Sequence, residues 1–264
     1  MPRVPVGGCN LYYEIEGEGD WLVFAHGGDG NHLCWWRQVA AFKSRYRCLT
    51  YDARGYGLSD VPEQPADAVH SAADDLLALM DHLDIGRAIL VGHSMGGMAV
   101  SGVSQSRPER VRALVMSDTP FGFQTAALPR WAVQMMDKIA KGFDVMENLF
   151  APGYAEREPE MHALYQAICR MRVSESPVRP ADDRVYEPYR RMRDAATVDY
   201  SAFPVPSLFI VGDQDQLTLP WMMEETAAAV GGARFVTIPG AGHSPFFEQT
   251  GLYNAALEAF LSQV

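Results

Sequence analysis

Residues 89–100 read ILVGHSMGGMAV, an apolar run of strand length that passes through a glycine-flanked serine into a second apolar run. A serine hydroxyl is a poor nucleophile unless it is exposed, oriented and paired with a base. A tight turn from strand to helix exposes the serine, but it crowds the backbone and needs small residues two positions away on either side. Gly92 and Gly96 meet this need around Ser94. The stretch therefore predicts a strand, a sharp turn carrying a nucleophilic Ser94, and a helix.

The helix after Ser94 predicts where an anion forming beside the serine would be stabilised. The first N–H groups of a helix have no partner within it and face any such anion. We expect the amide of Met95 to be one donor of this oxyanion hole. The amide of Gly28, in the glycine-rich loop AHGGDGN (25–31), is expected to be the other, and His26 in that loop is interpreted as structural.

A general base must lie elsewhere in the chain, and His243 is the favoured candidate among seven histidines. His243 lies in IPGAGHSPFFEQ (238–249), a glycine-rich loop between a predicted strand and the last predicted helix. Loops at the carboxyl ends of strands carry the reactive groups of open α/β sheets. Five other histidines are interpreted as surface or packing residues: His32, His70, His82, His93 and His162. Of these, His93 lies on the turn itself and is expected to face away from the serine.

A carboxylate must orient the imidazole and stabilise its charged form. The segment IVGDQD (210–215) offers two candidates at the end of a predicted strand. We favour Asp215, because the first aspartate after the glycine, Asp213, is better suited to cap or brace the turn. Local spacing places neither side chain, so Asp213 stays an alternative, and Asp118 at the end of VRALVMSD (111–118) is a third.

Strand-like and helix-like stretches alternate around these motifs. Two short strands around Gly7 and Gly8 are followed by apolar runs of strand length at 21–28, 46–52, 87–92, 111–118, 205–215 and 233–240. Helical periodicity occurs at 71–83, where Ser71 and Asp74 are spaced as a capping box, and in stretches that begin at Met95 and Pro220. A last helix places five apolar residues on one face: Leu252, Ala256, Leu257, Phe260 and Leu261. This alternation predicts an α/β fold with a mainly parallel sheet.

Residues 122–203 interrupt the alternation with a long, Met- and Arg-rich, helix-compatible segment broken by prolines. We expect an α/β core formed by residues 1–121 and 204–264, with a helical cap at 122–203. Substrate pockets are largely apolar, with a few polar groups. Several aromatic residues could line such a pocket here, and those selected as substrate-binding candidates are Trp35, Trp131 and Phe246.

Composition bounds the class of protein. The 264 residues, 48% of them hydrophobic, suffice for a sizeable core. The net charge of −11 and the scattered lysines and arginines argue against a nucleic-acid surface. An N-terminus without an apolar signal segment, and the lack of an 18-residue apolar run, lead us to expect a cytoplasmic protein with no membrane partner. The four cysteines form no CxxC pair, so no metal site is predicted from them.

Five motifs in order resemble the α/β-hydrolase superfamily: HGG (26–28), YDARGYGLSD (51–60), GHSMGG (92–97), VGDQD (211–215) and GAGHSPFFEQ (240–249). The resemblance covers nearly the whole chain except residues 122–203, where the superfamily places its variable cap. The resemblance implies an eight-stranded, mostly parallel sheet with flanking helices and a cap after the sixth strand. It also implies a serine–aspartate–histidine triad carried by Ser94, Asp215 and His243, with no metal or organic cofactor.

Within that superfamily the chain resembles small bacterial esterases, enol-lactonases and carbon–carbon bond hydrolases. SMGGM (94–98) and SDTP (117–120) are similar to enol-lactonases, whereas carbon–carbon hydrolases usually carry Asn where His93 stands. A serine nucleophile argues against haloalkane dehalogenases and epoxide hydrolases, which use aspartate. We therefore expect a serine hydrolase that cleaves a small apolar or aromatic ester or lactone through an acyl-enzyme. Carbon–carbon cleavage and a slow-turnover ligand sensor stay open as alternatives, as does a homodimer.

Overall fold

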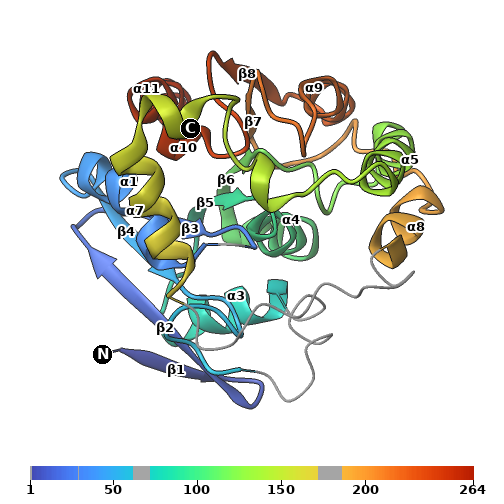
Figure 1. Ribbon diagram of the computed structural model, residues 1–264. Helices are drawn as coiled ribbons and strands as arrows, with labels where there is room; N and C mark the ends of the chain where they lie inside the picture. The colour runs from blue at the N-terminus through green and yellow to red at the C-terminus, as the bar shows by residue number, and fades with distance from the viewer. Residues whose placement is uncertain (1, 29, 62–71, 172–185) are drawn as a thin grey trace.

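The computed structural model describes residues 2–28, 30–61, 72–171 and 186–264. In this part of the chain, eight strands form one sheet in the order β1-β2-β4-β3-β5-β6-β7-β8 (Figure 1). β2 pairs antiparallel with β1 and β4, and the other neighbours are parallel. The strands are β1 Arg3–Val6, β2 Cys9–Glu16, β3 Asp20–Ala25, β4 Tyr46–Tyr51, β5 Ala88–His93, β6 Val111–Ser117, β7 Ser207–Gly212 and β8 Arg234–Ile238. The predicted α/β fold with a mostly parallel, eight-stranded sheet is confirmed.

Helices cover both faces of the sheet because successive strand residues point to opposite sides. In β3, Val23 joins the core beneath helices α3 (Ala72–His82), α4 (Gly96–Ser106) and α9 (Pro220–Ala229), while its neighbour Phe24 joins the core on the opposite face. That second core is covered by α1 (Trp36–Phe42), α10 (Pro245–Glu248) and α11 (Thr250–Leu261). Strands buried on both faces explain why the central runs read as continuous apolar sequence.

The described parts of the segment between β6 and β7 contain several helices, and Figure 1 shows them in two groups. α5 (Ala127–Ala140) and α8 (Glu187–Arg193) pack together beside α9. α6 (Tyr154–Arg157) and α7 (Pro159–Cys169) lie near the short 3₁₀ helix η1 (His32–Trp35). The two other 3₁₀ helices of the described chain are η2 (Pro108–Arg110) and η3 (Met146–Asn148).

Two details of the helix predictions need comment. The expected inner face of the last helix included Leu252, but that side chain is 47% exposed and Tyr253 is buried instead. Residues 253, 257, 260 and 261 recur every three to four positions and therefore define the buried stripe, one residue out of phase with Leu252. The predicted capping residue Ser71, and His70 before it, lie outside the described residues.

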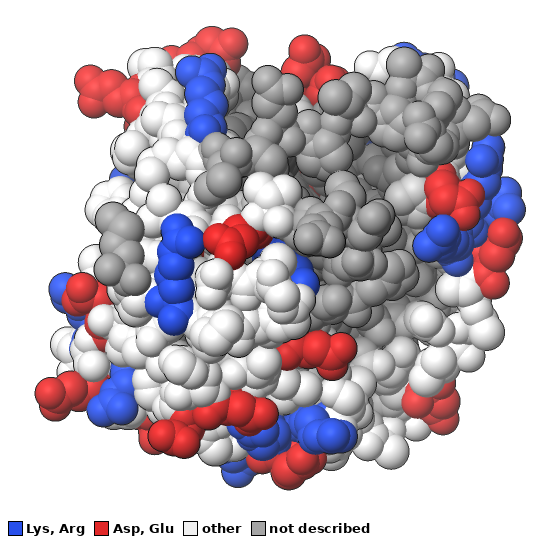
Figure 2. All heavy atoms as spheres, turned by 90° about the horizontal axis from the view of Figure 1, so that it is seen from below, with Lys and Arg blue, Asp and Glu red and all other residues white. Residues whose placement is uncertain are grey.

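Charged side chains of both signs lie among one another on the face seen in Figure 2. Exposed charged groups form ion pairs in the described chain, such as Lys43 with Glu16 and Arg130 with Glu225. No helix within the described ranges has the length and apolar character needed to cross a bilayer.

Candidate active site

Ser94 occupies a strained turn between β5 and α4. Its φ angle is 48°, in the left-handed region that residues with a Cβ adopt at a cost of about 1 kcal/mol or more. The flanking glycines are required sterically: a Cβ on Gly92 would collide with the Val100 side chain, and one on Gly96 with the Ala25 carbonyl. Ser94 itself is half-buried. The local sequence therefore folds as a turn that presents this one side chain.

The loop after β3 lies beside the start of α4. A Cβ built on Gly28 would lie 3.9 Å from the Met95 Cβ, so the structure brings the two predicted oxyanion donors close together. Backbone hydrogen bonds occupy the amides of Ser94 and Gly97, whereas Met95 donates no backbone hydrogen bond within the described ranges. Met95 is the N-cap of α4, so its amide lies at the positive end of a helix of 11 residues.

Asp215 and His243 meet in the interior at the carboxyl ends of β7 and β8. The Nδ1–H of His243 donates to Asp215 Oδ2 at 2.8 Å, and both side chains are almost fully buried. The amides of Leu217 and Thr218 donate to the other carboxylate oxygen at 2.8 and 3.1 Å. Because Asp215 fixes the proton on Nδ1, the Nε2 of a neutral His243 is left as the basic atom.

Asp213, the alternative acid, lies elsewhere. Its side chain belongs to an exposed residue and accepts a hydrogen bond from the Gly240 amide at 2.8 Å. Asp213 therefore braces the turn after β8, and the geometry around His243 involves Asp215 instead.

His93 has a contact that the sequence did not reveal. Its Nε2–H donates to the carbonyl of His243 at 2.7 Å, and the two ring centroids are 5.0 Å apart. Burial, followed by the charge of His243, keeps the pKa of His93 well below its usual value, so the ring is neutral. The residue before the serine thus supports the loop of the histidine, which also places the His243 ring beside the turn that carries Ser94.

Asp118, the third candidate acid, also lies at this edge of the sheet. Its φ angle is 49° and its side chain is completely buried. Oδ1 accepts from the Gly212 amide at 2.9 Å, and Oδ2 lies 3.0 Å from the Ser117 hydroxyl. Asp118, Asp215 and His243 each offer an atom within 4.8 Å of the others, the one such cluster of possible metal ligands in the described residues. The direct Asp215–His243 hydrogen bond favours a proton relay over metal coordination in this cluster.

Glu248 on α10 holds the His243 loop from the other side. Its carboxylate accepts from the amides of Gly242 at 2.9 Å and Ser244 at 3.3 Å, on either side of His243. The other oxygen accepts from the Ala151 amide at 2.8 Å, in the segment between β6 and β7. Burial raises the pKa of Glu248 to about 7, despite these three donors.

The three predicted pocket aromatics are buried residues with identifiable contacts. Trp35 is 0% exposed, and its ring centroid lies 4.5 Å from that of Phe246, which in turn contacts His93. Trp131 on α5 donates from Nε1 to the Leu217 carbonyl at 2.7 Å, two residues from Asp215. Trp35 and Phe246 pack beneath the site, and Trp131 supports the acid loop, so a role for them in binding substrate stays a prediction.

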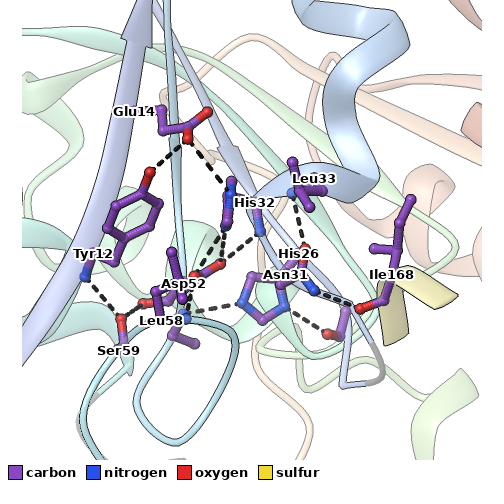
Figure 3. A network of polar contacts seen from close by, with 12 residues as sticks. Tyr12, Glu14, His26, Asn31, His32, Leu33, Asp52, Leu58, Ser59 and Ile168 are labelled. Atoms are coloured by element: carbon purple, nitrogen blue, oxygen red, sulfur yellow. Dashed lines mark hydrogen bonds and ion pairs between the residues drawn. The ribbon is translucent and has the colours of Figure 1, made fainter. Parts of the chain in front are cut away.

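A polar network holds the loop of Gly28 in place (Figure 3). His26 accepts the Ala53 amide at Nε2, at 3.0 Å, and its Nδ1–H donates to the Gly27 carbonyl at 2.7 Å. These two contacts tie the His26 ring to the backbone of its own loop and of the loop after β4. Nearby, His32 Nδ1 lies 2.8 Å from Asp52 Oδ1, and the His32 amide donates to that same oxygen at 2.6 Å.

Comparisons with known proteins agree with the observed fold. The chain is 26% identical to 3-oxoadipate enol-lactonase 2 of Acinetobacter baylyi, with 96% of this chain and 93% of that protein covered. It is 29% identical to 2-(acetamidomethylene)succinate hydrolase of Mesorhizobium japonicum, with 91% and 87% covered. The crystal structure of the enol-lactonase from Burkholderia xenovorans LB400 superposes with a TM-score of 0.76 at 28% identity, covering 99% of this chain and all of that one. The model of the alpha/beta hydrolase family matches residues 22–256, and the chain therefore belongs to that family.

Proposed function

We propose that this chain is a serine hydrolase that cleaves a carboxylic ester or lactone through an acyl-enzyme. The observation that carries the proposal is the 2.8 Å hydrogen bond between His243 and Asp215, at the sheet edge where Ser94 occupies its strained turn. The relatives support the same class of reaction, since two of them are enol-lactonases by name.

In the acylation step, Nε2 of His243 takes the proton of the Ser94 hydroxyl while Oγ attacks the carbonyl carbon. The imidazolium that forms keeps its hydrogen bond to Asp215, which offsets the new charge. The carbonyl oxygen becomes an oxyanion and accepts hydrogen bonds from the amides of Gly28 and Met95. Each such donor contributes about 3 kcal/mol to lowering the barrier.

Collapse of the tetrahedral intermediate breaks the bond to the leaving oxygen, which takes the proton from Nε2 of His243. In an ester this oxygen departs as an alcohol, whereas in a lactone it stays attached to the acyl chain. Water then attacks the acyl-Ser94 carbonyl as His243 takes its proton, and that proton returns to Ser94 Oγ when the acid is released. Ser94, His243 and Asp215 end the cycle in their starting states.

We further propose that residues 122–203 form the cap over this site and select the substrate. The aromatic side chains of α5 and its neighbours favour an apolar or aromatic acyl or alcohol part, because apolar pocket walls exclude water from uncharged groups. Phe121 and Trp131 pack with ring centroids 5.4 Å apart at the start of this segment. Small enol-lactones and aryl esters are the substrates that we expect first.

The test is hydrolysis of p-nitrophenyl acetate and a panel of aryl esters, lactones and vinylogous diketones by the wild type and by Ser94→Ala. We expect ester and lactone turnover that the substitution lowers at least about 10⁴-fold. Ser104→Ala, a buried helix serine whose hydroxyl donates to the Val100 carbonyl, is the matched control and should retain activity. Wild-type turnover by Ser94→Ala would overturn the nucleophile, diketone cleavage without esterase activity would identify a carbon–carbon hydrolase, and a single stoichiometric turnover would identify a sensor.

A further inference from the structure

Two buried carboxyl groups, rather than one, lie beside His243. Asp118 follows β6, Asp215 follows β7 and His243 follows β8, so three consecutive strands of the sheet bring them to one edge. The three residues are at most 2% exposed, and one side-chain atom of each lies within 4.8 Å of the others. The mechanism above uses only one of the two carboxyls.

The two carboxyls have unequal surroundings. Asp215 accepts two backbone N–H groups and the His243 Nδ1–H, which together stabilise an anion. Asp118 accepts one backbone N–H, from Gly212, and its other oxygen lies beside the Ser117 hydroxyl, which can either donate or accept. When two carboxyls share a water-excluded site, the less well solvated one keeps its proton.

The groups that face this cluster also favour a protonated Asp118. Glu248 from α10 adds negative charge toward Asp118, and the buried Tyr253 from α11 faces the same carboxyl. Lys138 from α5 acts on Asp215 rather than on Asp118. Burial, followed by the charge of Asp215, raises the pKa of Asp118 well above its usual range. A protonated Asp118 can donate to Ser117 while its other oxygen accepts from Gly212, so both oxygens are satisfied.

We propose that Asp118 is a positioning residue that holds a proton beside the Asp215–His243 pair and replaces Asp215 as the acceptor of the His243 Nδ1–H when Asp215 cannot serve. The inference rests on the proposed function of that pair. The strained backbone of Asp118 is held by the hydrogen bond from its amide to the Ile210 carbonyl at 2.8 Å, and one of its carboxyl oxygens lies within 4.8 Å of an imidazole nitrogen of His243.

The test is a double-mutant cycle of Asp215→Asn and Asp118→Asn, with Asp213→Asn as the matched control. We expect Asp215→Asn to lower kcat/KM about 100-fold, Asp118→Asn less than tenfold, and the double variant to about the level of Ser94→Ala. Residual activity of Asp215→Asn should exceed that of the double variant at every pH, because Asp118 can still accept from His243 in the single variant. Equal activities of Asp215→Asn and the double variant would overturn the proposal.

A second measurement separates this proposal from the proposed function. The Nδ1–H proton of His243 should give a far-downfield NMR signal in the wild type and in folded Asp215→Asn, and no such signal in the double variant. This signal does not require turnover, so it tests Asp118 even if Ser94→Ala were to keep full activity. Loss of the signal in Asp215→Asn, with circular dichroism showing an intact fold, would contradict the role of Asp118.

Discussion

The molecule contains two buried histidine–aspartate pairs of nearly the same local geometry, His243–Asp215 and His32–Asp52. In each pair Nδ1 lies 2.8 Å from the carboxylate, and the carboxylate is fully buried. Each carboxylate also accepts two backbone amides, those of Leu217 and Thr218 for Asp215, and those of His32 and Leu58 for Asp52. The hydrogen bond between the two residues therefore does not define a catalytic site by itself.

The pairs differ in the groups that surround each imidazole. Nε2 of His32 lies 3.6 Å from the carboxylate of Glu14, whose Oε1 also accepts from the Tyr12 hydroxyl at 2.5 Å (Figure 3). His243 instead lies beside the turn of Ser94, and its carboxylate has Asp118 as a second neighbour. A histidine between two carboxylates is a structural link, whereas the proposed mechanism uses His243 between a carboxylate and the Ser94 hydroxyl, where it can move a proton.

Removing each imidazole should separate these roles most clearly. We expect His243→Ala to lower kcat on p-nitrophenyl acetate by about 10⁴-fold or more, because the base and the acid of the reaction are lost together. His32→Ala should keep kcat within about tenfold while lowering the free energy of unfolding by about 3 kcal/mol, since the buried Asp52 carboxylate would lose its imidazole partner. Initial rates and urea unfolding of both variants check this contrast, and an inactive, fully stable His32→Ala would reverse the assignment.

Replacing Asp52 or Asp215 should lower the free energy of unfolding less than removing the His32 imidazole. The variant that loses more stability should be the one that loses less activity. Burial would raise the pKa of Asp52, but the hydrogen bond from His32 leads a set of contacts that together lower it below 3.8. The stability gained from this lowered pKa is present above about pH 4 and is lost as the pH falls further. We expect Asp52→Asn to cost about 2 kcal/mol at pH 7. Asp215→Asn should cost less stability and more activity, as measured by urea unfolding at pH 7 and pH 3.

The His243–Asp215 pair is supported by Glu248, and this support should depend on pH near neutrality. The pKa of Glu248 is raised from 4.5 to about 7, so its contribution to stability is full below pH 4.5 and is lost as the pH rises through 7. We expect the difference in unfolding free energy between wild type and Glu248→Gln to shift by about 1–2 kcal/mol in favour of the variant between pH 4.5 and pH 8. Glu16→Gln, at an exposed carboxylate, should show no such trend. A flat difference for Glu248→Gln would remove Glu248 as a titrating support.

The smallest effect is expected at Glu14, on the open side of the His32 pair. The side chain is 43% exposed and 3.6 Å from Nε2, so the ion pair contributes no more than about 0.5 kcal/mol. Glu14→Gln should change the unfolding free energy by that amount or less, and kcat not at all. A loss of unfolding free energy above 2 kcal/mol, measured by thermal or urea unfolding, would show that Glu14 stabilises the His32–Asp52 pair as a buried residue would, despite its exposure.

Much of the fold and of the nucleophile turn could be predicted from sequence because the signals are local. Apolar runs of strand length, helical periodicity and the spacing of Gly92, Ser94 and Gly96 each report on residues a few positions apart. The acid was harder: VGDQD offers two aspartates, and the structure separates them through distant contacts, Asp213 with Gly240 and Asp215 with His243. Local spacing cannot encode which side of a turn faces a residue 28 positions later.

The supporting residues could not be predicted for the same reason. His93 contacts a carbonyl 150 positions away, and Asp118 accepts from an amide 94 positions away. The aromatic residues posed a different difficulty, since a pocket wall and a core share one composition. Trp35 and Phe246 pack against each other beneath His93. The sequence alone cannot distinguish an aromatic residue packed in this way from one that lines a pocket.

Helix α5 has a consequence for exchanging parts between members of this family. Trp131 and Lys138, two residues on this helix, donate to the carbonyls of Leu217 and Gln216 at 2.7 and 2.9 Å, next to Asp215. A chimaera that receives residues 122–203 from another protein would need to bring both donors with it, or the grafted segment would leave the acid loop unsupported. Substrate range and catalytic competence would then be inherited together, and would not behave as separable modules.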